Sequence, residues 1–159
     1  MNGEAQHPDE FADAFEPALA RLQIRIETAC ASEAEWPAQV SAGIRAALAF
    51  ASAEPAAAEV LTNEAMAGGR AGFARYDRMI DHFATALRPG RNERAEGSWL
   101  PEITEKTMVG GVAMLIAQRL TFDRHAELPA LAPEAIQFVL TPYLGAADAR
   151  RVALGEQAE

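Results

Sequence analysis

The feature that most constrains the fold is the stretch from Met108 to Leu120, in which only Gln118 and Arg119 are strongly polar. A helix here is apolar around nearly its whole circumference, so it must be covered on more than one side. It is too short to cross a bilayer, which takes about 20 apolar residues. We therefore expect a helix that lies between the core of its own subunit and a second subunit.

At helical spacing this segment has two different faces. A bulky face, expected to be core, consists of Met108, Val109, Val112, Leu115 and Ile116. A slim face, expected to meet a helix of a second subunit, consists of Ile103, Thr107, Gly110, Ala113, Met114 and Ala117. Gly110 and Gly111 each cost a helix interior roughly 1 kcal/mol relative to alanine. Close packing on the slim face would offset that cost.

The whole chain is predicted to be helical. Half of its 159 residues are hydrophobic, alanine dominates that half, and strand-forming residues are sparse. A chain of this length is one ordinary domain with a real core. We expect an all-α fold, an orthogonal or antiparallel bundle of about six helices.

Prolines and glycines divide the chain into its predicted elements. Pro17 interrupts the first predicted helix, and Pro142 is expected to bend the last turn of another. We interpret residues 9–154 as one helical domain between a flexible lead-in of residues 1–8 and a polar tail of residues 155–159. The first predicted helix spans residues 9–31, the second begins at Trp36, and the third begins at Pro55 and ends at Gly68 and Gly69. The remaining helices are predicted at 70–88, 102–123, 133–144 and 146–154, with a mobile loop at 89–100.

Charge and cysteine content exclude several classes of function. Fourteen basic and 23 acidic side chains give a net charge of −9, which repels a phosphate backbone. The single cysteine, Cys30, excludes an internal disulfide, and no charged-then-apolar leader starts the chain. We expect a cytoplasmic protein without direct DNA contact and without a membrane segment.

No catalytic or metal constellation is recognisable. His7, His82 and His125 lie far apart and none has a second histidine at helical spacing. Asp77 and Asp81 share a face, but such carboxylates more often pair with a cation or face water. We expect no metal, no cofactor and no catalysis. The remaining enzymatic hypothesis is a small helical enzyme that uses Tyr76 and an acid such as Asp77.

Four segments resemble the C-terminal regulatory domain of TetR-family transcriptional repressors. These segments are FADAFEPALARL at 11–22, WPAQVSAGIRAALAFASAEPAAAEVL at 36–61, EKTMVGGVAMLIAQRL at 105–120 and LAPEAIQFVLTPYLG at 131–145. Members of that family carry about 50 residues of helix-turn-helix domain before this point, the part that enters the major groove. The chain has no such residues, so we expect it to be unable to bind DNA by itself.

The resemblance implies a homodimer and a small, mostly apolar effector. The dimer would form through helices near 102–123 and 133–144, which adds Ile136, Val139, Leu140 and Tyr143 to the slim face as interface residues. The effector cavity would be lined by inward side chains. These are Phe50, Met66, Phe73, Tyr76, Ile80, Phe83, Met108, Val112 and Leu115.

Two alternatives remain open from the sequence. Apolar stripes such as Phe73, Ile80 and Phe83 also occur in fully packed cores, so the domain could be a ligand-free association module. A chain without the DNA-binding domain could also act as a dominant-negative partner that forms heterodimers with a full-length paralogue.

Overall fold

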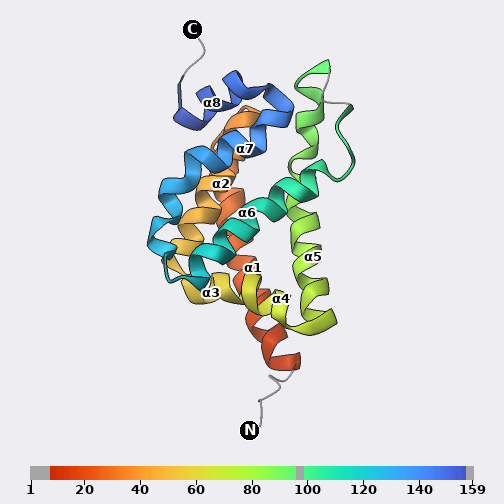
Figure 1. Ribbon diagram of the computed structural model, residues 1–159, viewed down its shortest axis with the longest axis vertical. Coiled ribbons are helices and arrows are strands. Elements are labelled where there is room, and N and C mark those ends of the chain that lie inside the picture. Colours follow the sequence, from red (N-terminus) through yellow and green to blue (C-terminus); the bar gives the residue numbers. More distant parts are fainter. Residues whose placement is uncertain (1–7, 96–98, 157–159) are drawn as a thin grey trace.

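A computed structural model of the chain describes residues 8–95 and 99–156, and every regular element in these ranges is helical (Figure 1). The all-α prediction is confirmed. Within the described ranges, no helix combines the length and apolarity that spanning a lipid bilayer requires. The helices are α1 (Pro8–Ala31), α2 (Trp36–Ala53), α3 (Pro55–Glu59), α4 (Ala65–Ala67), α5 (Gly69–Thr85), α6 (Thr104–Thr121), α7 (Ala132–Leu144) and α8 (Ala146–Leu154). Shorter turns are η1 (Val60–Glu64), η2 (Arg88–Asn92) and η4 (His125–Leu131).

Most helix boundaries follow the prolines and glycines. Pro37 and Pro55 occupy the first turns of α2 and α3, where proline loses no helical hydrogen bond. Gly145 and Gly155 have positive φ at the ends of α7 and α8, a conformation that side chains with a Cβ rarely adopt. Pro17 lies inside α1 without ending it. Its side chain is exposed, so the hydrogen bond that it removes is lost on the solvent side.

The segment from Pro55 to Ala67 is helical throughout but not a uniform α-helix. Its middle, η1, is a π turn, which accommodates one extra residue per turn and occurs frequently at functional sites. The side chain of Asn63 in this turn donates to the carbonyl of Ala117 at 3.2 Å and to the hydroxyl of Thr121 at 3.1 Å. The π turn is thereby tied to the C-terminal half of α6.

The helices form two layers. α1 packs along α2 in one layer, and α5 packs against α6 in the other, while α7 and α8 pack on each other and on α2. In Figure 1, α6 crosses obliquely in front of α1 and α2, and α5 runs beside it at the edge of the molecule. Lys106 of α6 holds the second layer together by binding Asp77 at 2.8 Å and Asp81 at 3.0 Å on α5.

α7 is the most deeply buried helix for its length, and this corrects one prediction. Ile136, Val139, Leu140 and Tyr143 are between 0% and 2% exposed within the single chain. A second subunit could not contact them without opening the fold. They belong to the subunit's own core, and the outward side of α7 carries Phe138 instead, which is 49% exposed.

The loop predicted at residues 89–100 also differs from expectation. Its first part forms η2, and Arg91 in this turn donates to the carbonyls of Leu100 and Pro101, both at 2.7 Å. These bonds hold residues on either side of positions 96–98, which lie outside the described residues, as do the predicted lead-in before Pro8 and the tail after Glu156.

Candidate functional site

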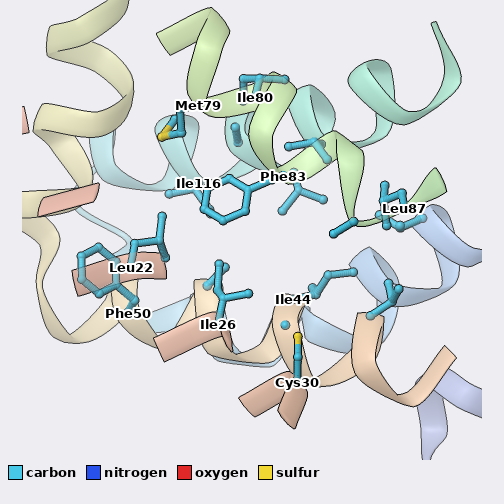
Figure 2. A pocket seen from close by; sticks show the side chains of 18 of the residues that line it. Leu22, Ile26, Cys30, Ile44, Phe50, Met79, Ile80, Phe83, Leu87 and Ile116 are labelled. Carbon is cyan, nitrogen blue, oxygen red and sulfur yellow. The ribbon is translucent and has the colours of Figure 1, made fainter. Parts of the chain in front are cut away.

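A cavity of about 440 Å³ lies between the two helical layers (Figure 2). The α1 and α2 layer contributes one wall, with Leu22, Ile26 and Cys30 from α1 and residues between Trp36 and Ala51 from α2. The opposite wall comes from α5 and α6. Ala58, Leu61 and Thr62 close one end. A volume of this size is within the range of small-molecule sites, which run from about 300 to 1,000 Å³.

The structure brings part of the predicted effector site together. Phe50, Ile80, Phe83 and Val112 all line the cavity. In Figure 2, Phe83 projects from α5 toward Leu22 and Ile26 on the facing wall, with Ile116 of α6 beside it. These side chains face a space because α5 and α6 are held apart from α1 and α2 over this stretch.

The other predicted effector residues do not line the cavity. They are Met66, Phe73, Tyr76, Met108 and Leu115. Phe73 is 53% exposed, and its ring lies 6.1 Å from that of buried Tyr76. At the N-terminal end of α5 the preceding helix lies close, since a Cβ on Gly72 would lie 2.5 Å from the carbonyl oxygen of Ala65. The cavity borders α5 only from Met79 onward.

The α1 wall was missed by sequence reasoning as a binding surface. Leu22, Ile26 and Cys30 recur at every fourth residue, the spacing of one helix face. That signal identifies an inward face but is the same for packed core and for a cavity wall. Gly43 of α2 lies opposite, where an added Cβ would be 3.2 Å from Cys30 Sγ and 3.5 Å from Ile26 Cγ2. The glycine lets α1 and α2 approach closely along this wall.

Three polar side chains at the cavity already donate to backbone carbonyls of the protein. The thiol of Cys30 donates to the carbonyl of Gln39 at 3.3 Å, the indole of Trp36 donates to that of Ala86 at 3.1 Å, and the hydroxyl of Thr62 donates to that of Ala58 at 2.7 Å. Among the described residues, none that lines the cavity is charged. An ion bound inside would lose its hydration without compensation. The site is therefore suited to uncharged, apolar molecules.

Cys30 is held in the thiol form at neutral pH. Burial raises its pKa above the ordinary value of 9.0, and the nearby carboxylate of Glu27 raises the pKa further. Because the thiolate is the nucleophile, a raised pKa slows reactions at sulfur. Cys30 acts here as an apolar wall residue.

Trp36, which lines one end of the cavity, belongs to a cluster of aromatic and glycine contacts. The Trp36 ring meets Tyr143 edge-on, with centroids 5.2 Å apart. Gly90 of η2 fits against both rings, because an added Cβ there would lie 2.2 Å from Trp36 Cη2 and 2.8 Å from Tyr143 Cδ1. Behind this cluster, Arg91 pairs with the buried carboxylate of Glu105. The position of η2 is thus linked to the start of α6.

The slim face of α6 is divided between surface and core. Ile103 is 70% exposed and Met114 is 54% exposed, Thr107 is exposed, and a Cβ on Gly110 would meet nothing within 4 Å. Phe138 of α7 continues this surface, since a Cβ on Gly111 would be 3.2 Å from its ring. Ala113 and Ala117 are buried in the subunit, and Ala113 lines the cavity. These two residues are not available to a partner.

The polar groups considered for catalysis have structural partners. Asp77 and Asp81 both bind Lys106, and His125 Nδ1 lies 3.1 Å from the carbonyl oxygen of Ser52. In the described part of the chain, no group of three or more His, Cys, Asp or Glu side chains could hold a metal ion. Tyr76 is buried, and burial raises its pKa above 10.0, so it is a poor proton donor or acceptor near neutral pH.

The fold and the site together define a class, an all-helical domain that encloses an apolar cavity. Comparisons with protein-family models, with curated proteins and with solved structures found no match.

Proposed function

We propose that this chain is a small-molecule-binding and homodimerisation domain of a TetR-like transcriptional regulator. The observation that carries the proposal is the apolar cavity of about 440 Å³, whose wall includes Phe50, Ile80, Phe83 and Val112. A preformed apolar space between helices favours binding, because little further ordering is required when a ligand enters. The effector would be small, mostly apolar and uncharged where it is enclosed.

The exposed part of the α6 slim face supports the dimerisation half of the proposal. Ile103, Gly110, Met114 and Phe138 form an apolar strip along α6 and the adjoining side of α7. The bare backbone at Gly110 would let a second α6 approach closely. A two-fold axis through this strip would place the same residues of both subunits against each other.

α6 could connect ligand binding to the dimer, because it takes part in both surfaces. Val109, Val112 and Ile116 line the cavity, whereas Ile103 and Met114 project to the outside. A ligand that favours one position of α6 would shift the population of dimer geometries. In a complete regulator this change would alter the spacing of two DNA-reading heads. The proposal assigns no DNA contact and no catalysis to this chain.

A second candidate is an association module without a ligand, or a dominant-negative partner of a full-length paralogue. The exposed apolar strip on α6 favours this candidate as much as the first. The cavity distinguishes them, because an association module has no need of an open internal space.

Native mass spectrometry of the purified chain, before and after denaturing extraction, tests the proposal. A dimer that carries a defined extra mass, released on denaturation, is the expected result. A dimer that neither retains nor takes up an apolar molecule would exclude ligand binding and leave the association module as the remaining candidate. A monomer that takes up apolar molecules would remove the dimerisation half and retain ligand binding, and a monomer that binds none would remove both.

A further inference from the structure

The residues that line the cavity form two parallel rows. Leu22, Ile26 and Cys30 lie along α1, and Met79 and Phe83 lie along α5, with Leu87 two residues past its end. The α1 row repeats every fourth residue, so it spans about two turns, or about 12 Å at 1.5 Å per residue. Figure 2 shows the two rows facing each other across the space. The cavity is therefore elongated along the helices.

The two ends of the cavity differ in burial. At one end Phe50, Leu61 and Thr62 are at most 5% exposed, so this end is closed. At the other end Trp36 and Gln39 are half-buried and Pro89 is exposed. In Figure 2, Phe50 and Leu22 lie at one end of the space, and Leu87 lies at the other. On this difference in burial, a molecule would enter and leave past Trp36, Gln39 and Pro89.

The interior offers few groups that could bind a polar group. The thiol of Cys30 and the hydroxyl of Thr62 already donate to backbone carbonyls, and no charged residue of the described chain lines the space. The gain on binding then comes from burying hydrocarbon, which is non-directional and grows with the area buried. A polar head has to remain at the open end.

From this geometry we infer that the ligand is a single extended hydrocarbon chain, with its methyl end at Phe50 and Leu61 and its polar end leaving past Cys30 and Gln39. This inference rests on the proposed function and narrows its ligand. An extended chain rises about 1.25 Å per carbon, given C–C bonds of about 1.5 Å. The rows of about 12 Å therefore hold about ten carbons. At about 30 Å³ for each methylene-sized group, the cavity volume holds about 15 carbons.

The experiment is a displacement titration with uncharged straight-chain alcohols from octanol to octadecanol. The displaced probe is N-phenyl-1-naphthylamine, an uncharged molecule that fluoresces when it is bound in apolar surroundings. We expect affinity to rise about fourfold per methylene and to level off between about ten and fifteen carbons. The matched compact control is 1-adamantanol, which has the same number of carbons as 1-decanol. We expect it to bind at least tenfold more weakly than 1-decanol.

A variant shortens the space from within. Ala47 lines the cavity on α2, one turn from Ala51 at the closed end. Ala47→Phe should move the levelling point to chains shorter by about five carbons, because the four residues from Ala47 to Ala51 span about 6 Å of helix. Ala49→Phe, on the exposed side of the same helix, is the matched control and should leave the series unchanged. Ala47→Leu serves as a milder substitution if the melting curve of Ala47→Phe is no longer cooperative.

The orientation has its own readout in the single cysteine of the chain. Labelling of Cys30 by a maleimide should slow little with octanol, which occupies the closed end, and at least tenfold with hexadecanol, which extends past the thiol. Equal protection by both alcohols would overturn the orientation. If affinity is independent of chain length, or 1-adamantanol matches 1-decanol, the chain inference fails and the proposed function stands. If neither the probe nor any alcohol binds, the ligand-binding half of the proposed function fails as well.

Discussion

The guanidinium of Arg91 donates to both carboxylate oxygens of Glu105, from Nε to Oε1 at 2.6 Å and from Nη2 to Oε2 at 2.9 Å. The carboxylate is 4% exposed, and it lies in the first turn of α6. A bidentate pair of this kind is both strong and directional. It fixes η2, and with it the wall of the cavity around Trp36, relative to the helix that carries the proposed dimer strip.

This pair predicts a specific loss of stability in acid. The hydrogen bond from Arg91 is the largest cause that lowers the pKa of Glu105 below its ordinary 4.5. A lowered folded-state pKa stabilises the fold fully above the unfolded value, and the contribution is lost as pH falls through the folded value. Glu105→Gln should lower the free energy of unfolding at pH 7 and flatten its decline below pH 4.5. Urea titrations across this range measure both effects. Glu134→Gln, exposed on α7, is the control, and an unchanged pH slope in Glu105→Gln would contradict the prediction.

Tyr143 predicts a second loss of stability, in alkali. Burial is the largest cause that raises its pKa above 10.0, and the nearby charge of Glu105 adds to it. A raised folded-state pKa stabilises the fold fully below the unfolded value, and that contribution is lost as pH rises above it. The variant Tyr143→Phe should unfold with a weaker pH dependence above pH 10.

At pH 7 the same substitution should be neutral or stabilising by up to about 1 kcal/mol. The hydroxyl is buried and has no partner in full hydrogen-bond geometry among the described residues, although it lies close enough to the carboxylate of Glu105 for that contact to raise its pKa. Removing an unpaired hydroxyl removes a desolvation cost without removing a bond. Urea unfolding at pH 7 measures the difference. A loss of more than about 2 kcal/mol would mean that the hydroxyl is paired in solution.

A side chain at Gly90 should clash with the rings of Trp36 and Tyr143. The variant Gly90→Ala would place a Cβ 2.2 Å from Trp36 Cη2, so the indole or η2 must shift. Overpacking of this size costs about 1–3 kcal/mol. The penalty should be smaller in a Trp36→Phe background, which a double-mutant cycle measures. Ala49→Leu, on the exposed side of α2, is the control and should be close to neutral, because the added side chain meets solvent.

The proposed dimer interface can be tested by adding bulk at Gly110. Gly110→Leu should weaken dimerisation at least about tenfold, because bulk on the strip would separate the two α6 helices. The monomer should tolerate the change, since the space around Gly110 is open. Sedimentation equilibrium measures the dissociation constant. Ala49→Leu, at an exposed position of α2, is the control. An unchanged dimer would show that the strip is not the interface.

Two phenylalanines distinguish a real cavity from a packed core. Phe15 is 1% exposed and is not among the cavity residues, so Phe15→Ala should cost about 3–5 kcal/mol. Phe83 already borders empty space, so Phe83→Ala removes fewer contacts. It should lower the free energy of unfolding by less than about 3 kcal/mol. Phe83→Ala should also admit bulkier ligands. Equal costs in urea unfolding would mean that the space beside Phe83 is filled.

The helices were predictable because their boundary signals are local. Pro37 and Pro55 mark helix starts, and Gly145 marks an end. These residues act through φ and a missing donor, which do not depend on distant parts of the chain. The ordered η2 was not predictable in this way. It depends on Arg91 reaching Glu105, which lies outside the loop.

The site was only partly predictable. Phe50, Ile80 and Phe83 were expected at the cavity and line it, whereas Phe73 was expected there and is exposed. Ile80 and Phe73 belong to the same stripe of α5, so periodicity treats them alike. The difference lies in what each part of α5 faces, because the helix approaches Ala65 closely at Gly72 and borders the cavity only from Met79 onward.

Taken alone, the sequence determined the helical class, most helix boundaries, the inward faces and an acidic, largely apolar chain. These properties follow from propensity, capping and periodicity, which act over a few residues. Only the tertiary structure decided which inward faces meet and which stay apart. The core position of Tyr143, the exposure of Phe73 and the elongated space beside Cys30 depend on distances between helices remote in sequence. Such distances are set by packing of the whole domain, so no local pattern encodes them.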